Sequence, residues 1–195
     1  SSIVYPSTSN ATTATKTAPK ATTTKGRIQY EHSYYEGDLV DGIQHGKGVY
    51  VWDDGTRYEG DFFEGNITGH GVSYYTNGDE YDGEWVKGKK CGHGVYKSYG
   101  KNDIKGGTFV SYIYEGEWKD GKKHGRGIYY YANGDRYEGE FRDNKMDGKG
   151  TYYWANGDYY VGSFVNAKRE GYGVYYYKNG KVQAGYWANG KFLHP

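Results

Sequence analysis

A single phrase recurs along this chain at a fixed interval. It has the general form Tyr-x-Gly-x-(Trp/Phe) and begins at six positions: Tyr35, Tyr58, Tyr81, Tyr114, Tyr137 and Tyr160. Each step is 23 residues except the third, which is 33 residues and therefore holds an insertion of ten. A period of this size predicts an array of small units that pack only on their neighbours. Such an array offers a long surface and seldom a catalytic pocket.

The composition indicates what the core of such an array is made of. The 195 residues include 33 glycines, 26 tyrosines and 5 tryptophans, whereas aliphatic residues are scarce. We therefore expect aromatic rings packed over glycine to form the core. The single cysteine, Cys91, excludes a disulfide framework and favours a reducing compartment. No stretch approaches 18 apolar residues, so we expect no membrane-spanning helix.

The sequence divides into two regions. Residues 1–26 are rich in Ser, Thr, Ala and Lys without apolar periodicity, so we interpret them as a flexible arm. The same bias is typical of the end of an organelle transit peptide, which leaves a targeting remnant as an alternative. Residues 27–195 hold the array. Residues 1–30 carry basic residues and no acid, and the rest is slightly acidic, so we expect no nucleic-acid partner.

Each unit has the pattern of a β-hairpin, which makes the chain all-β. In Tyr114-Glu-Gly-Glu-Trp118, alternation places both rings and the glycine on one face and both acids on the other. Because its side chain then faces solvent, replacing Glu117 with Ala should cost under about 0.5 kcal/mol. The second strand carries Gly-x-Gly and further rings. An Asn-Gly or Asp-Gly pair follows, and we expect positive φ at both of its residues.

The glycines need an explanation, because glycine weakens a strand. We expect rings to lie flat over glycines of the adjacent strand, where no Cβ stands in the way. The predicted core of rings and glycines comprises Tyr58, Gly60, Phe62, Tyr81, Gly83, Trp85, Tyr114, Gly116, Trp118, Gly125, Gly127, Tyr137, Gly139, Phe141, Gly148 and Gly150.

Two patterns could carry chemistry, but each has a simpler interpretation. The segments 46–48 and 148–150 read Gly-Lys-Gly, yet they lack the longer loop and the Ser or Thr of a phosphate-binding loop. His70 and His93 occupy the same register position in neighbouring units and are the one pair that could share a metal. We interpret them as exposed edge residues. The sequence therefore predicts no catalytic, cofactor-binding or metal site.

Charged residues also recur in register. The carboxylate after most of the repeat tyrosines is interpreted as part of a solvated stripe that faces Arg57 and Arg136 on adjacent strands. Lys47, Arg126 and Lys149 form a sparse basic row that could meet phosphoinositide headgroups. This row is interrupted by uncharged residues and offset by acids.

The full pattern resembles a known family. Tyr-x-Gly-x-(Trp/Phe)-x6-Gly-x-Gly-x-(Tyr/Ser)-x-(Trp/Tyr/Ser), ending in Asn-Gly, is similar to the MORN repeat, the membrane occupation and recognition nexus motif. It recurs in six full units and a partial seventh from Gln183. Leu39 and Ser73 replace rings, Gln183 replaces the opening tyrosine, and the third unit is interrupted at 99–113. The resemblance implies a single elongated, twisted, antiparallel sheet of tandem hairpins.

The resemblance also carries expectations about function. Family members are mostly scaffolds or targeting modules, so we expect a non-catalytic assembly subunit that docks other proteins, without a cofactor. The alternative is a peripheral membrane-targeting module that binds anionic phospholipid headgroups. An intracellular location is expected, with the cytoskeleton or cilium favoured and the mitochondrion or another organelle as the alternative.

Partner contacts are expected at the insertion and at the ends. The insertion at about 100–109 has turn and strand residues and predicts a protruding hairpin, with Phe109 and Tyr112 as possible contacts. Segments 29–32 and 183–192 are predicted edge strands, and Phe192 is exposed near the second. Unpaired edges invite pairing. We therefore expect a protein partner, with a homodimer also possible.

Overall fold

The computed structural model describes residues 21–102 and 106–195, which form one antiparallel sheet of 15 strands. Each strand pairs with the strands before and after it in the chain, so spatial order follows sequence order. This confirms the predicted all-β sheet of tandem hairpins. The strands are β1 Thr23–Gln29, β2 Ser33–Val40, β3 Ile43–Trp52, β4 Arg57–Phe63, β5 Asn66–Tyr74, β6 Glu80–Val86, β7 Lys89–Asn102, β8 Gly107–Lys119, β9 Lys122–Tyr131, β10 Arg136–Arg142, β11 Lys145–Tyr153, β12 Tyr159–Val165, β13 Lys168–Tyr176, β14 Val182–Ala188 and β15 Lys191–His194.

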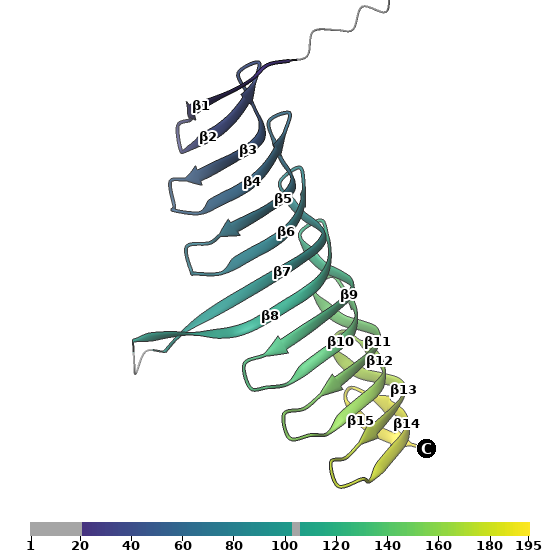
Figure 1. Cartoon of the computed structure of the whole chain (residues 1–195). Coiled ribbons are helices and arrows are strands. Elements are labelled where there is room, and N and C mark those ends of the chain that lie inside the picture. The colour runs from purple at the N-terminus through teal and green to yellow at the C-terminus, as the bar shows by residue number, and fades with distance from the viewer. Residues whose placement is uncertain (1–20, 103–105) are drawn as a thin grey trace, which may run out of the picture.

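The sheet is elongated and twisted along its length, and one hairpin projects from its edge (Figure 1). That hairpin is formed by β7 and β8, which contain the insertion and pair Gly100 with Phe109. Its tip, residues 103–105, lies outside the described residues. The predicted hairpin at the insertion is therefore present.

The N-terminal boundary differs from expectation. Strand β1 begins at Thr23, so residues 23–26 of the predicted arm belong to the sheet, where they pair with β2. Residues 1–20 of that arm lie outside the described residues. Of the expected edge strand at 29–32, Gln29 ends β1 and residues 30–32 form the turn that joins β1 to β2, closed by a 2.8 Å hydrogen bond from Tyr30 N to Ser33 O.

The structure has two kinds of turn, and the links between units are the ones that differ from expectation. Two-residue turns with positive φ at both positions lie inside the units, as at Asp120 (50°) and Gly121 (80°). In the Asn-Gly links only the glycine has positive φ, as at Gly134 (94°). Asn133 has a different function, because its Oδ1 accepts a 2.9 Å hydrogen bond from Asp135 N. The expectation of positive φ at both Asn-Gly residues was wrong, since these longer links select asparagine for its side-chain acceptor.

One face of the sheet carries a continuous ladder of buried rings. From the second unit on, the repeat tyrosine contacts a Trp or Phe of its own strand and another of the next unit, in edge-to-face pairs. Tyr35 of the first unit, whose own strand carries Leu39, contacts Phe62 of the next unit. Tyr114, for example, lies 5.2 Å from Trp118 and 5.1 Å from Phe141 between ring centroids. Tyr114 is 0% exposed. A single-layer sheet can bury a ring this fully only where the sheet curls around the ring. We call this the buried ladder; its members are Tyr35, Tyr58, Phe62, Tyr81, Trp85, Tyr114, Trp118, Tyr137, Phe141, Tyr160, Phe164 and Trp187.

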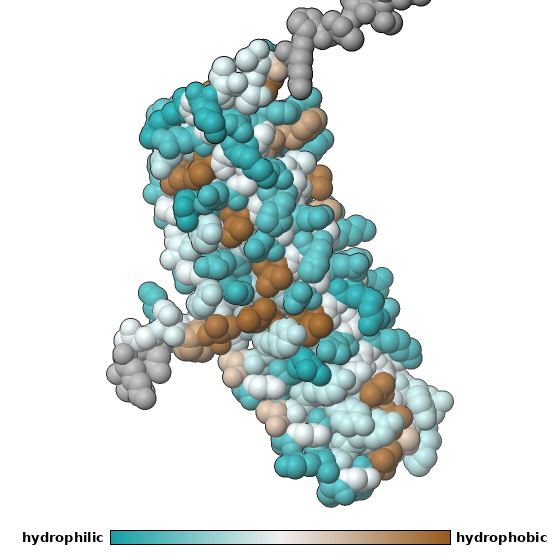
Figure 2. Space-filling view, in the orientation of Figure 1, coloured by the Kyte–Doolittle hydropathy of each residue, from teal (hydrophilic) through white to brown (hydrophobic). Residues whose placement is uncertain are grey.

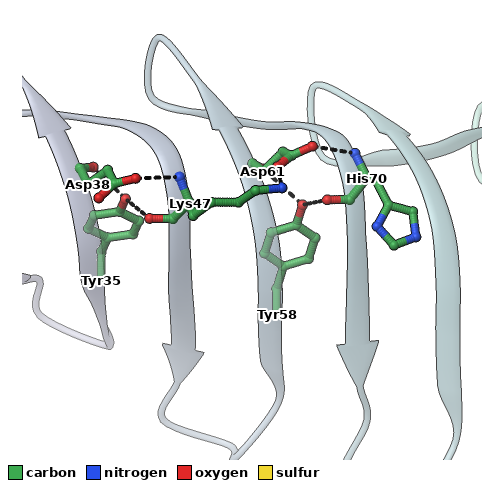
Figure 3. A network of polar contacts seen from close by, with 6 residues as sticks. All are labelled: Tyr35, Asp38, Lys47, Tyr58, Asp61 and His70. Carbon is green, nitrogen blue, oxygen red and sulfur yellow. Dashed lines mark hydrogen bonds and ion pairs between the residues drawn. The ribbon is translucent and has the colours of Figure 1, made fainter. Parts of the chain in front are cut away.

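A β-bulge in each unit anchors the ladder tyrosine. The residue three after the tyrosine is bulged, and its carbonyl accepts the tyrosine hydroxyl hydrogen, at 2.5 Å from Tyr35 to Asp38 O and 2.8 Å from Tyr58 to Asp61 O (Figure 3). The side chain of the bulged residue accepts a backbone N–H from the next strand, as Asp38 does from Lys47 at 3.0 Å. The hydrogen bond from the Lys47 backbone is the largest cause of the lowered pKa of Asp38. A hydrogen bond from the Lys25 side chain lowers this pKa further.

The two glycines of each Gly-x-Gly pair have different functions. A Cβ on Gly127 would lie 2.5 Å from Tyr114 Oη, so the ring-over-glycine prediction is confirmed for this second glycine. The first glycine, Gly125, has φ of +77° and faces the Glu117 carboxylate instead. Gly116, opposite Gly127, would place a Cβ 2.5 Å from the Gly127 Cα, so the two backbones also approach closely.

Candidate functional site

A second set of rings lies beside the buried ladder and is partly exposed. It is continuous from Tyr75 to Tyr177, with neighbouring centroids 4.5–6.0 Å apart. We call this set the outer row; its members are Tyr75, Tyr96, Tyr112, Tyr129, Tyr131, Tyr152, Trp154, Tyr175 and Tyr177. The outer row lies beside the buried ladder, and this face of the sheet opens into pockets beside Tyr75 and beside Tyr131, Tyr152 and Trp154. We call this ring-lined face the aromatic groove.

Carboxylates hold the outer row in place from one unit to the next. Asp135, which follows an Asn-Gly link and is buried, accepts the Tyr152 hydroxyl at 2.7 Å and the Ala155 N–H at 2.9 Å. The Asp79–Tyr96 and Asp158–Tyr175 pairs repeat this bond, each at 2.7 Å.

Two lysines lie between the two sets of rings. Lys90 Nζ lies 5.4–5.8 Å from the centroids of five rings, and Lys123 Nζ lies 5.5–6.0 Å from four. Burial lowers the pKa of Lys123, and the nearby Lys90 charge lowers it further. In the described part of the chain, neither ammonium has a carboxylate within 4.0 Å. In the described residues the groove therefore holds two half-buried lysine charges that face aromatic rings. A third cation in the same register, Arg169, also lies over rings but donates a 2.6 Å hydrogen bond to Gly190 O.

The sequence interpretation missed these two lysines. The signal that could have found them is the register, because the same position is Gln44, Ile67, Lys90, Lys123, Met146 and Arg169 in successive units. Only adjacent units three and four place lysine there, beside the projecting hairpin.

One ring is absent from the aromatic groove. The position held by Tyr50, Tyr96, Tyr129, Tyr152 and Tyr175 in other units is Ser73 in the second, as the sequence indicated. Ser73 pairs with Tyr58 and Tyr81 of the buried ladder. Here the surface opens into a pocket of about 350 Å³ lined by Trp52, Thr56, Ser73, Tyr75, Trp85 and Lys90.

Apolar surface also gathers at the base of the projecting hairpin (Figure 2). On β8, Phe109 is 47% exposed and Val110 is 43% exposed. Phe109 therefore lies on accessible surface, as expected of a contact residue. Its ring also covers Gly100 of the opposing strand, where a Cβ would lie 2.5 Å from Cζ.

The other two predicted partner contacts already pack within the chain. Tyr112 is stacked between Tyr96 and Tyr129, at centroid distances of 5.9 and 4.9 Å. Phe192 is half-buried and packs on Trp187 at 5.3 Å. Their possible role in partner contact stays a prediction.

The outer face of the sheet carries the charged residues, with pairings that differ from expectation. Among the described residues, Arg57 and Arg136 form no salt bridge with an acid on an adjacent strand. Arg57 lies 3.6 Å from Glu59 of its own strand, and Arg136 lies 3.4 Å from Glu138 of its own strand. Across to the neighbouring strand, the Arg136 guanidinium stacks on the Tyr153 ring at 4.3 Å. Alternation along one strand places such i, i+2 pairs on the same face.

Two members of the basic row and the two candidate metal-binding histidines have acidic or polar partners. Lys47 forms an ion pair with Asp61, and Lys149 Nζ donates to Ser163 Oγ at 2.8 Å. His70 lies 2.7 Å from Asp82 and His93 lies 4.0 Å from Glu115. Within residues 21–102 and 106–195, no three His, Cys, Asp or Glu side chains cluster as a metal site requires. The same residues include no helix long and apolar enough to span a membrane.

Comparison of the chain with models of protein families identifies the repeats of the array. A model of the MORN repeat matches residues 35–57, 58–80, 81–101, 114–136, 137–159 and 160–182. The chain therefore belongs to the MORN repeat family, a class of repeat module that binds proteins or membranes and is generally non-catalytic. A search of curated proteins finds no match to the chain.

Proposed function

We propose that this chain is a non-catalytic docking subunit that holds a polypeptide partner in its aromatic groove. The observation that carries this proposal is the pair Lys90 and Lys123. A half-buried charge without a counter-ion destabilises the free protein, and an acidic group of a partner offsets that cost. Ring faces supply apolar contact area along the same groove.

The groove favours a polypeptide over a lipid surface for two reasons. Its walls are aromatic and hold three cations, Lys90, Lys123 and Arg169, whereas anionic headgroups favour clusters of about four to eight basic residues. The more exposed basic row is offset by neighbouring acids, as in the Lys47–Asp61 pair. The assembly that receives this subunit is proposed to be intracellular, with the cytoskeleton or cilium favoured.

The test compares three forms of the full chain in cell extract by cross-linking and mass spectrometry. The first is the natural sequence and the second is Lys90→Ile with Lys123→Met, which places residues from other units of the array at both positions. The third, Lys47→Met with Lys149→Met, removes outer-face charge as a matched control. We expect the second variant, and not the third, to lose its cross-linked partners.

Equal capture by the first two forms would contradict a groove site. Vesicles containing phosphatidylserine and a phosphoinositide test the other class of ligand in parallel. Charge-driven vesicle binding that disappears at high salt, together with loss in the outer-face variant, would favour the membrane role instead.

A further inference from the structure

The pocket at Ser73 is a site from which the array has lost a tyrosine, and its surroundings still fit one. A pocket in the same register exists in the fifth unit, lined by Tyr131, Met146, Tyr152 and Arg169. There the position of Ser73 is filled by Tyr152. The pocket at Ser73 is larger, about 350 Å³ against about 270 Å³.

The loss interrupts the aromatic stacking. In the fifth unit the Tyr152 ring lies 5.6 Å from Tyr131 and 4.7 Å from Trp154. The equivalent neighbours of Ser73 are Trp52 and Tyr75, and in the described residues no ring contact joins those two. A ring between them would make the stack continuous from Tyr50 to Tyr177.

The residue that would bind the hydroxyl of the missing tyrosine also differs from its equivalent in the fifth unit. Where the ring is Tyr152, its hydroxyl bonds to the Asp135 carboxylate. At the pocket, the position of that aspartate is Thr56. A side-chain hydroxyl can replace the carboxylate as the partner of the tyrosine hydroxyl. In the first unit, Ser33 Oγ occupies the same register position and lies 2.6 Å from the Tyr50 hydroxyl.

We propose that the pocket at Ser73 receives a tyrosine side chain of the partner polypeptide, with an acidic residue of the same segment meeting Lys90. The partner ring stacks between Trp52 and Tyr75, and its hydroxyl bonds to Thr56. Lys90, which lines the pocket, supplies the charge that selects the acid. This inference rests on the proposed docking role and adds the chemistry of the bound segment.

The experiment selects random dodecapeptides displayed on phage against the full chain. Synthetic versions of the enriched peptides are then titrated by fluorescence anisotropy. The filled variant, Ser73→Tyr with Thr56→Asp, rebuilds the arrangement of the fifth unit. The outer-face variant, Lys47→Met with Lys149→Met, is the control, because it changes no residue that lines the pocket.

We expect the natural sequence to enrich peptides that contain a tyrosine and a nearby Asp or Glu. The filled variant should melt at a higher temperature, because it regains ring contacts and a hydrogen bond, and should bind these peptides at least about tenfold more weakly. The outer-face variant should bind within about threefold of the natural chain. Replacing the peptide tyrosine with Ala should cost about as much as filling the pocket.

Two outcomes would overturn the inference. One is enrichment of peptides that lack an aromatic residue. The other is binding that the filled variant retains but Lys90→Ile with Lys123→Met loses. In the second case the proposed docking role stands and only the tyrosine pocket fails. Failure of the cross-linking test, by contrast, contradicts the docking role itself.

Discussion

The Glu117 carboxylate accepts a 2.8 Å hydrogen bond from the backbone N–H of Arg126 on the neighbouring strand. The bulge at Glu117 breaks the regular ladder between β8 and β9, so this N–H depends on the side chain for a partner. The expectation that Glu117 contributes almost nothing, drawn from its place on the solvent face, therefore does not hold.

We predict that Glu117→Ala lowers the free energy of unfolding by about 1 kcal/mol, because a charge-assisted hydrogen bond to backbone is lost at an exposed site. Urea denaturation measures the change. Glu115→Ala is the control, since this carboxylate lies 4.0 Å from His93 on the exposed surface and should cost under about 0.5 kcal/mol. Equal losses from both changes would contradict a special role for the bulged acid.

Gly127→Val should unfold its part of the array. The added Cβ would lie 2.5 Å from Tyr114 Oη, and the ring has no free space because it is fully buried. We expect a loss of about 3 kcal/mol or more, as for severe overpacking, measured as a fall in melting temperature. Gly107→Ala, where a Cβ meets nothing within 4 Å, should leave melting nearly unchanged.

Ala167→Gly should stabilise the protein. Ala167 has φ of 67° in the two-residue turn between β12 and β13, where most other units place glycine. A left-handed conformation costs a residue with a Cβ about 1–2 kcal/mol, and glycine removes most of that strain. Calorimetry should show a higher melting temperature. The reciprocal change, Gly121→Ala at φ of 80°, should lower it by a similar amount.

Lys123→Met should also stabilise the free protein, by about 1 kcal/mol. Because burial lowers the pKa of Lys123, the unfolded chain binds its proton more tightly than the folded chain. The protonated lysine therefore destabilises the fold at neutral pH, and this cost is relieved as pH rises through the lowered pKa. Solvent screens part of the effect. Thermal melts at pH 7 test it, with exposed Lys122→Met as the control.

Deleting residues 100–107 should leave the array folded. Of the deleted residues that the structure describes, 100–102 end β7 and Gly107 begins β8, and the ladder rings on these strands, Tyr114 and Trp118, are outside the deletion. We expect a change of about 1 kcal/mol or less, as for a change in surface loop length. Circular dichroism and urea denaturation follow it, and loss of the folded spectrum would show that the hairpin supports the array.

The sequence by itself determined the repeat, the hairpins and the buried face. These follow from local rules: the period marks the units, and alternation assigns Tyr114 and Trp118 to one face and Glu115 to the other. The ring-over-glycine contact could be predicted because glycine weakens a strand. Its recurrence beside so many rings therefore indicates that the rings need the space that a Cβ would fill.

Tertiary structure decided the features that depend on pairing between strands. The bulge shifts register by one residue, which turns Glu117 toward a backbone N–H and separates the functions of Gly125 and Gly127. Tertiary structure also brought Lys90 and Lys123 together between two sets of rings. The pocket at Ser73 depends on both sequence and tertiary structure. The sequence shows that a tyrosine is missing there, but only the packed neighbours show the space that it leaves. Neighbouring units create these sites, because no single unit contains both the ring and the strand it covers.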